Sequence, residues 1–268
     1  MPTASLNGFG LYFEDTDPKN EAGLPVVVFL HGAAGNAMSW WQQIPAFSQA
    51  HRCVTYDCRG FYRSPDTTGE GIAGFVADLE ALVDHLGAVR VSLVAQSMGG
   101  RAAIAFAVRH PERTAALVMA NTWGAFSWPE NWQLSSDLGA QSLGQIQAGM
   151  IRGLSRGFQD NNKELTFLFC QISGANRAPK PELAGAQPGG PSLAEVRQLK
   201  VPLLCITSEE DIVIPAPLVQ NLAREVPGAE CVTLSSVGHS IYYEAPSRFN
   251  ELVLGFLAKH IGGGSVQR

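Results

Sequence analysis

The chain alternates between short apolar runs and segments whose apolar residues recur every three or four positions. Residues 25–30 are a continuous apolar run, which predicts a strand buried on both faces. Residues 91–94, a short run of β-branched and apolar residues, predict another buried strand, and 52–56 is a further strand between them. Apolar positions over 72–86 follow the helical period and stop before Gly87, which predicts an amphipathic helix. Strands and helices in this order are typical of a mostly parallel sheet with helices on both faces.

The alternation is interrupted once, after a sixth strand. Two strands of an N-terminal hairpin precede residue 25, and a helix over 101–110 leads to a strand at 115–120. Residues 122–198 then contain three tryptophans and a loose Pro-, Gly- and Ala-rich stretch. Helical patches are expected around 143–158 and 165–172. Beyond this insertion we expect strands at 202–207 and 230–234 and helices at 217–225 and 247–260.

This interruption divides the chain into two expected parts. Residues 1–121 and 199–268 should form an α/β core domain, and residues 122–198 should form a helical cap inserted after the sixth strand. The cap is expected over the C-terminal edge of the sheet, which is where ligands bind in open α/β sheets.

Ser97 lies where an expected strand turns sharply into an expected helix. A serine at such a corner is lifted clear of the sheet, with a helix N-terminus behind it. The backbone of such a nucleophile elbow is strained, so bulky side chains two positions away would collide. Ala95 and Gly99 occupy those positions. As a bare pattern this also fits a serine that caps a buried helix.

Acidic residues and a histidine follow the later strands. Glu209, Glu210 and Asp211 come directly after the strand at 202–207, and His239 follows the strand at 230–234. Attack on an ester carbonyl needs a nucleophile, a base and a group that orients the base. The order Ser, Asp, His along the chain is the order used by the α/β-hydrolase fold.

Several motifs in register carry a resemblance to a known family. They are His31-Gly32-Ala33-Ala34-Gly35, Asp57-Cys58-Arg59-Gly60, Ala95-Gln96-Ser97-Met98-Gly99-Gly100, Asp211 four residues before Pro215, and Gly238-His239 followed by Glu244 and Pro246. Over nearly its whole length the chain resembles α/β-hydrolases of the esterase, lactonase and haloperoxidase-like group. The segment 117–122, which leads into the cap, is similar to the enol-lactonase branch.

The resemblance implies a catalytic triad. Ser97 would be the nucleophile, His239 the general base and then acid, and Asp211 the residue that orients His239. The spacing to Pro215 favours Asp211, while Glu209 or Glu210 remains an alternative third member.

The resemblance also implies an oxyanion hole formed by the backbone N–H groups of Ala33 and Met98. Loss of one such donor typically costs about 3 kcal/mol in the barrier. The chain departs from the family after Asp57, where Tyr62 replaces a glycine, so this turn should differ and Phe61 or Tyr62 should lean toward the pocket. His31 is expected to anchor its loop rather than to act in catalysis.

Aromatic residues beside these motifs and in the cap are candidates to line an apolar pocket. The substrate-binding candidates are Trp40, Trp123, Trp128 and Tyr242. Most cap aromatics are expected to form the cap's own core.

Composition excludes several other classes of protein. The chain has 268 residues and a net charge of −5, with basic residues scattered singly, which argues against nucleic-acid or membrane binding. Its start resembles no secretory signal, so a cytoplasmic location is expected. The five cysteines lack zinc-type spacing, and Cys53, Cys205 and Cys231 should be reduced and buried in strands. No metal and no cofactor are implied, because no metal-ligand or nucleotide-binding motif occurs.

These observations predict a serine hydrolase acting on a small to medium, largely apolar carboxylic ester or lactone. Enol-lactone hydrolysis and carbon–carbon bond hydrolysis would use the same triad. A slow-turnover receptor for a small molecule could also retain it.

Overall fold

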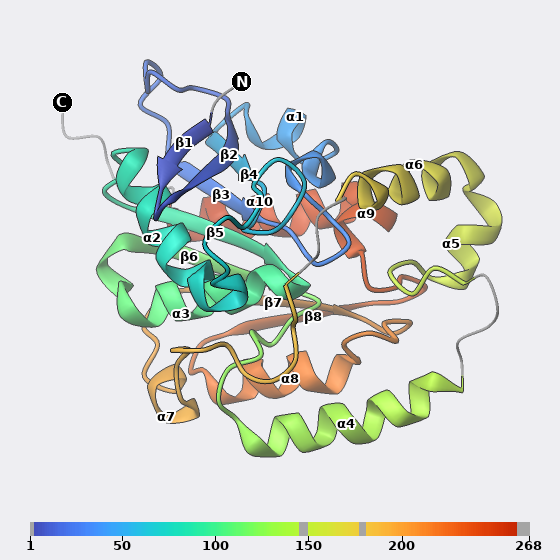
Figure 1. Cartoon of the computed structure of the whole chain (residues 1–268). Helices are drawn as coiled ribbons and strands as arrows, with labels where there is room; N and C mark the ends of the chain where they lie inside the picture. Colours follow the sequence, from blue (N-terminus) through green and yellow to red (C-terminus); the bar gives the residue numbers. More distant parts are fainter. Residues whose placement is uncertain (1–2, 145–149, 177–180, 262–268) are drawn as a thin grey trace.

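An eight-stranded sheet runs through the computed structural model, which describes residues 3–144, 150–176 and 181–261 (Figure 1). Its order is β1-β2-β4-β3-β5-β6-β7-β8. The strands are β1 Thr3–Leu6, β2 Phe9–Asp15, β3 Val26–Leu30, β4 Arg52–Tyr56, β5 Val91–Gln96, β6 Thr114–Ala120, β7 Leu203–Ser208 and β8 Glu230–Leu234. The pairs β1–β2 and β2–β4 are antiparallel and every other pair is parallel. The predicted α/β class with a mostly parallel sheet is confirmed.

The centre of the sheet is buried on both faces, as its continuous apolar runs require. In β3 every residue is buried, with Val28 on one side of the sheet and the neighbouring Val27 and Phe29 on the other. The paired strand β5 is buried throughout as well. Because all parallel strands end at the same edge, the loops after β3, β5, β6, β7 and β8 meet there.

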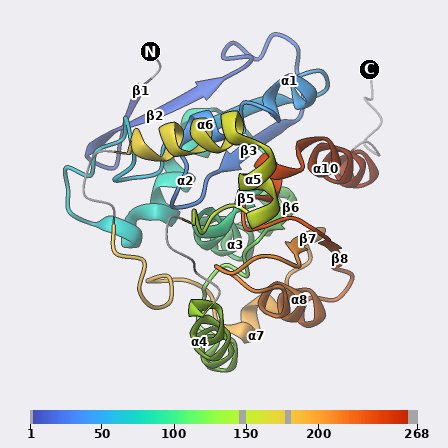
Figure 2. The ribbon, with the colours of Figure 1, turned by 90° about the vertical axis from the view of Figure 1, so that its right-hand side faces the viewer.

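Helices cover both faces of the sheet (Figures 1 and 2). Residues of α2 (Phe75–His85), α3 (Gly100–Arg109) and α8 (Ala216–Glu225) belong to one apolar core, and those of α1 (Ile44–Phe47) and α10 (Pro246–Ile261) belong to the other. The remaining helices are η1 Ala37–Trp40, η2 Gly71–Gly74, η3 Ser97–Gly99, η4 Pro111–Arg113, α4 Pro129–Leu143, α5 Arg156–Asn161, α6 Lys163–Gly174, α7 Leu193–Val196 and α9 Ile241–Glu244. Among the described residues, no helix has the length and apolar character needed to cross a bilayer.

The segment between β6 and β7 is helical but not where the sequence predicted. The patch expected at 143–158 is wrong in position, because α4 ends at Leu143, residues 150–155 form no helix and α5 begins only at Arg156. Residues 145–149 of that patch lie outside the described residues. The sequence did not predict α4, because its most buried side chains, Asn131 and Ser142, are polar. The buried face of this helix therefore lacks apolar residues at every third or fourth position. The patch at 165–172 is confirmed as part of α6. Helices α5 and α6 lie on the right of Figure 1 and α4 runs along its lower edge, and all three face the viewer in Figure 2.

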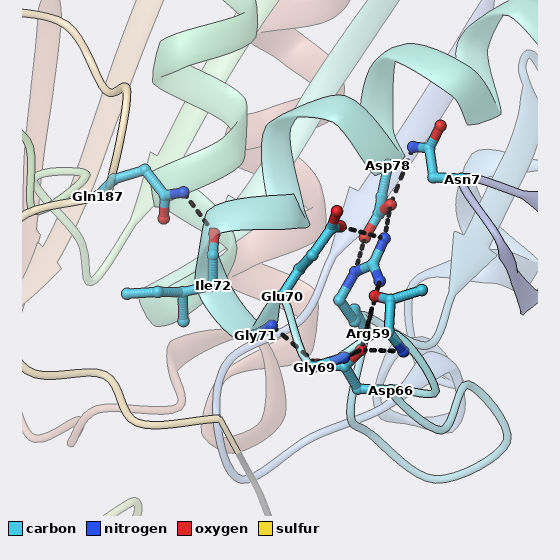
Figure 3. A network of polar contacts seen from close by, with 10 residues as sticks. Asn7, Arg59, Asp66, Gly69, Glu70, Gly71, Ile72, Asp78 and Gln187 are labelled. Carbon is cyan, nitrogen blue, oxygen red and sulfur yellow. Dashed lines mark hydrogen bonds and ion pairs between the residues drawn. The ribbon is translucent and has the colours of Figure 1, made fainter.

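A buried arginine organises the loop after β4 (Figure 3). Arg59 is fully buried and donates to both carboxylate oxygens of Asp78 on α2, at 2.8 and 2.6 Å. Its guanidinium also pairs with Asp66 at 3.3 Å and Glu70 at 3.2 Å, while Asn7 of the N-terminal hairpin donates to Asp78. The network ties the hairpin, the loop and α2 together, so the role of Arg59 is structural.

One expectation about the cysteines is wrong. Cys53 and Cys205 are buried in strands as expected, but Cys231 is exposed. Cys231 lies on β8, the edge strand of the sheet, where burial is incomplete along most of the strand. All five cysteines are free thiols in the described chain.

Candidate active site

Ser97 begins η3 directly after β5, with a backbone φ of +50°. This left-handed conformation is uncommon for a residue with a side chain and marks a strained corner. Close packing around the corner excludes larger neighbours. A Cβ on Gly99 would collide with the Leu30 carbonyl oxygen and lie 2.7 Å from its carbon, and a Cβ on Gly32 would lie 3.0 Å from Ser97 Cβ. The small residues therefore allow β3 and its loop to pass against the serine.

The structure brings Ser97, His239 and Asp211 together at the C-terminal edge of the sheet. His239 Nε2 lies 2.8 Å from Ser97 Oγ, and His239 Nδ1 lies 2.8 Å from Asp211 Oδ2. A carboxylate only accepts hydrogen bonds, so Nδ1 carries the proton and Nε2 presents its lone pair to the serine hydroxyl. His239 and Asp211 are buried and Ser97 is half-buried. This arrangement can remove a proton from the serine as its oxygen attacks a carbonyl.

The carboxylate of Asp211 is held from both sides. Its Oδ1 accepts the backbone N–H groups of Val213 and Ile214, each at 2.8 Å. Its Oδ2 accepts the side-chain amide of Asn121 at 2.9 Å in addition to His239. These bonds leave the Asp211 side chain little freedom to rotate.

Sequence reasoning missed Asn121. It follows β6 with a φ of +48°, and its amide donates to Ser208 Oγ at 2.9 Å as well as to Asp211. Ser208 in turn donates to the carbonyl of Gly238 at 2.6 Å. The available signal was position alone, since Asn121 and Ser208 both come at the ends of parallel strands.

The two other acidic candidates lie elsewhere. Glu209 and Glu210 are exposed, and their backbone N–H groups donate to Leu234 at 3.0 Å and Val237 at 3.2 Å. The imidazole of His239 faces Asp211 instead.

The glycine-rich loop after β3 is anchored by His31, as expected. His31 Nε2 accepts the backbone N–H of Cys58 at 2.9 Å, so Nδ1 carries the proton and donates to the Gly32 carbonyl at 2.8 Å. Ala33 lies in this loop and Met98 follows the serine at the start of η3, where the first N–H groups of a helix have no partner within it.

Two buried asparagines fasten the same loop to α6. The Asn36 amide donates to the Ile172 carbonyl at 2.9 Å, and the Asn176 amide donates to the Gly35 carbonyl at 3.0 Å. Asn36 also caps η1, because its Oδ1 accepts the Met38 N–H at 3.0 Å. The inserted helices are therefore bonded directly to the loop that carries Ala33.

The four aromatic candidates for substrate binding are all buried among other rings. The Trp40 ring lies 4.7 Å from Tyr242 and 5.1 Å from Phe29 between centroids. Trp123 and Trp128 pack at 6.3 Å in an aromatic cluster on the opposite side of the sheet. Their contact with substrate stays a prediction.

The turn after Asp57 places its two aromatic residues differently. Phe61 is buried with its ring 5.2 Å from His31, whereas Tyr62 is 37% exposed. Tyr62 has a φ of +39°, in the left-handed region that favours glycine. Tyr62 therefore takes the glycine position of the family motif, and the Arg63 guanidinium lies 4.5 Å from the centroid of its partly exposed ring.

A cavity of about 410 Å³ lies between α4 and the loop that carries Asp211. It is lined by Leu138, Gln141, Ser142, Met150, Arg156, Glu209, Glu210, Asp211, Ile212 and Pro215. Ser97 and His239 are not among the described residues that line it. No group of three or more His, Cys, Asp or Glu side chains in the described ranges could hold a metal ion.

Comparisons with known proteins agree with this fold. Residues 25–156 match the family model described as the alpha/beta hydrolase fold. A protein of Stutzerimonas stutzeri (strain A1501) that carries the name carbamate hydrolase RutD is 27% identical over 256 residues, covering 90% of this chain and 95% of that protein.

Solved structures superpose over almost the whole chain. A thermophilic esterase from Thermogutta terrifontis matches with a TM-score of 0.76 and 26% identity, covering 97% of this chain and 98% of the esterase. The enol-lactonase from Burkholderia xenovorans LB400 matches with a TM-score of 0.76 and 23% identity, covering 96% of this chain and all of the lactonase chain (100%).

Proposed function

We propose that this chain, which has the α/β-hydrolase fold, is a serine hydrolase that cleaves a small to medium, largely apolar carboxylic ester or lactone. The observation that carries the proposal is the continuous hydrogen-bonded chain from Ser97 Oγ through His239 to Asp211, with both distances at 2.8 Å.

The proposed reaction passes through an acyl-enzyme. Ser97 Oγ attacks the carbonyl carbon while its proton moves to His239 Nε2, and the imidazolium then protonates the departing alkoxide oxygen. A water molecule, deprotonated by His239, attacks the acyl carbon and releases Ser97 and the carboxylic acid. Asp211 holds the productive tautomer of the imidazole and stabilises its positive charge. The backbone N–H groups of Ala33 and Met98 would donate to the oxyanion.

The serine nucleophile and the proteins similar to this chain support the proposed substrate class. Serine attack suits a carbonyl with an oxygen leaving group, and the similar esterase from Thermogutta terrifontis carries that activity in its name. A carbamate carbonyl, named in the relative from Stutzerimonas stutzeri, would be attacked in the same way. Contact of Trp40, Trp123, Trp128 and Tyr242 with an apolar acyl group is part of this proposal.

The division into core and cap is part of the proposal. Residues 1–121 and 199–268 would form the core, and residues 122–198 would form a cap that closes over Ser97. Two sets of contacts support this assignment: Asn36 and Asn176 join the loop after β3 to α6, and Glu244 accepts the N–H of Ser155 at the start of α5.

The test is turnover of a p-nitrophenyl ester series by the parent and by Ser97→Ala. The parent should turn over many times, and Ser97→Ala should lower kcat at least about 10³-fold. A fluorophosphonate should add covalently to Ser97 in the parent and not in the variant, as read by mass spectrometry. Ser235→Ala removes an exposed hydroxyl near His239 in sequence and should leave kcat unchanged. Full turnover by Ser97→Ala would refute the proposal.

The same assay separates the alternatives. A receptor would release about one equivalent of p-nitrophenol per chain and then stop, because its acyl-enzyme hydrolyses slowly. An enol-lactone hydrolase or a carbon–carbon bond hydrolase would label at Ser97 but prefer an enol-lactone or a dienol over every simple ester in the panel.

A cytoplasmic location is also proposed. All five cysteines are free thiols in the described residues, and unpaired cysteines are typical of reducing compartments.

A further inference from the structure

A carboxylate outside the proposed triad lies at the base of the loop that carries His239. Glu244, at the end of the short helix α9, accepts the backbone N–H of Gly238 with Oε1 and Oε2, both at 3.1 Å. Its Oε2 also accepts the backbone N–H of Ser155 at 3.0 Å. None of the steps proposed above uses this side chain.

The two backbones joined by Glu244 are in direct contact. A Cβ on Gly238 would collide with the backbone nitrogen of Ser155 and lie 2.9 Å from the Leu154 carbonyl carbon and 2.8 Å from Glu244 Oε1. Glycine is therefore required immediately before His239, because the inserted segment packs against that peptide.

Ser155 is itself a fixed point of the insertion. It is buried and forms the N-cap of α5, with its hydroxyl accepting the Phe158 N–H at 3.2 Å. Glu244 therefore bonds to the start of a helix, and a shift of α5 would be transmitted to Gly238.

His239 is thus held on both sides along its own backbone. Gln96, the residue before Ser97, donates its side-chain amide to the His239 carbonyl at 3.0 Å. On the other side of His239, Glu244 holds the backbone N–H of the preceding residue, Gly238. The imidazole between them is hydrogen-bonded to Asp211 and Ser97 at 2.8 Å each. A small displacement of the His239 backbone would therefore lengthen at least one of these two bonds.

We propose that Glu244 is a positioning residue for His239: its carboxylate holds the backbone N–H of Gly238, the residue before the histidine, and joins it to the inserted segment at Ser155. The proposal rests on the proposed function, in which His239 is the base. Burial raises the pKa of the Glu244 carboxyl, although the hydrogen bonds from Gly238 and Ser155 act in the opposite direction.

The test compares Glu244→Ala and Glu244→Gln with the parent on the preferred p-nitrophenyl ester. Glu244→Ala should lower kcat by about 10- to 100-fold with little change in KM, because a small displacement of the base affects the chemical step more than substrate binding. Glu244→Gln keeps one carbonyl oxygen for Gly238 and should recover part of the loss. Glu80→Gln alters a carboxylate bonded to Arg109 and His110 on the other face, and should leave kcat unchanged.

A spectroscopic measurement makes the test independent of turnover. The ring ¹H–¹⁵N signals of His239, assigned by their loss in His239→Ala, should shift or broaden in Glu244→Ala and not in Glu80→Gln. Parent-like kcat and an unchanged His239 signal in Glu244→Ala would overturn the proposal, as would equal losses in Glu244→Ala and Glu80→Gln. If Ser97→Ala retained activity, the proposed function would fail, while the His239 signal would still decide the role of Glu244.

Discussion

Replacement of Asp211 by asparagine tests the proton arrangement at the site. In the parent, Asp211 Oδ1 accepts the N–H groups of Val213 and Ile214, and Oδ2 accepts from His239 and Asn121. Two backbone donors face Oδ1, so the amide oxygen of Asp211→Asn must take that place. Its NH₂ group must then take the place of Oδ2 and face His239.

This placement reverses the tautomer of the histidine. An NH₂ group donates, so Nδ1 of His239 would have to accept and the proton would move to Nε2, which lies 2.8 Å from Ser97 Oγ. His239 then donates to Ser97 and cannot take its proton. Asn121 can adapt, because its own Oδ1 has no partner and can accept from the new amide after a flip. The fold should therefore persist while catalysis is lost.

The expected loss in kcat for Asp211→Asn is about 10⁴-fold, the size seen when a triad histidine is held in the wrong tautomer. At about 1.36 kcal/mol per tenfold this corresponds to roughly 5 kcal/mol in the barrier. The assay is steady-state hydrolysis of a p-nitrophenyl ester, with circular dichroism and a thermal melt to show that the variant is folded. Glu209→Gln and Glu210→Gln are the matched controls and should change kcat by less than about twofold, because both side chains are exposed. A folded Asp211→Asn that retains a kcat within about tenfold of the parent would contradict the reasoning.

Three other predictions concern stability. Arg59→Met leaves the carboxylate of Asp78, only 2% exposed, without its cation. The variant should lose about 3–5 kcal/mol in the free energy of unfolding measured by urea titration. Adding Asp78→Asn to the variant should restore part of that stability. Gly99→Ala places a Cβ against a backbone carbonyl oxygen that cannot move aside, so it should lower Tm markedly. Gly174→Ala should leave Tm unchanged, because no atom lies within 4 Å of the position of the added Cβ. Because burial raises the pKa of Glu244 above its ordinary value of 4.5, the native state holds this proton longer than the unfolded chain does. The stability of the parent relative to Glu244→Gln should therefore fall as pH rises from about 4.5 through the native pKa, and an opposite slope in urea titrations would show that the pKa is lowered instead.

Much of the core architecture could be read from local sequence. The strand expected at 52–56 matches β4, and the helix expected at 217–225 matches α8 within one residue. In a packed domain the residues of a strand or helix that face the core are apolar, and they recur with the period of that element. The pattern of burial can therefore be recognised from neighbouring residues in the sequence. The meeting of the Ser97 and His239 loops follows from the same pattern, since parallel strands end at one edge.

The inserted segment shows where this reading failed. The buried face of α4 carries Asn131, whose amide donates to Leu218 and whose oxygen accepts from Asn221. A polar face that is satisfied by partners on another helix has no apolar period, so no local pattern revealed it.

The partners of the site residues depend on contacts between distant parts of the chain. Asn121 and Asp211 lie 90 residues apart, and Ser155 and Glu244 lie 89 residues apart, yet each pair is hydrogen-bonded. Residue type and chain order identify the groups capable of the chemistry. Which oxygen accepts from which N–H depends on side-chain positions of a few tenths of an ångström, and these are set when helices and loops far apart along the chain pack together.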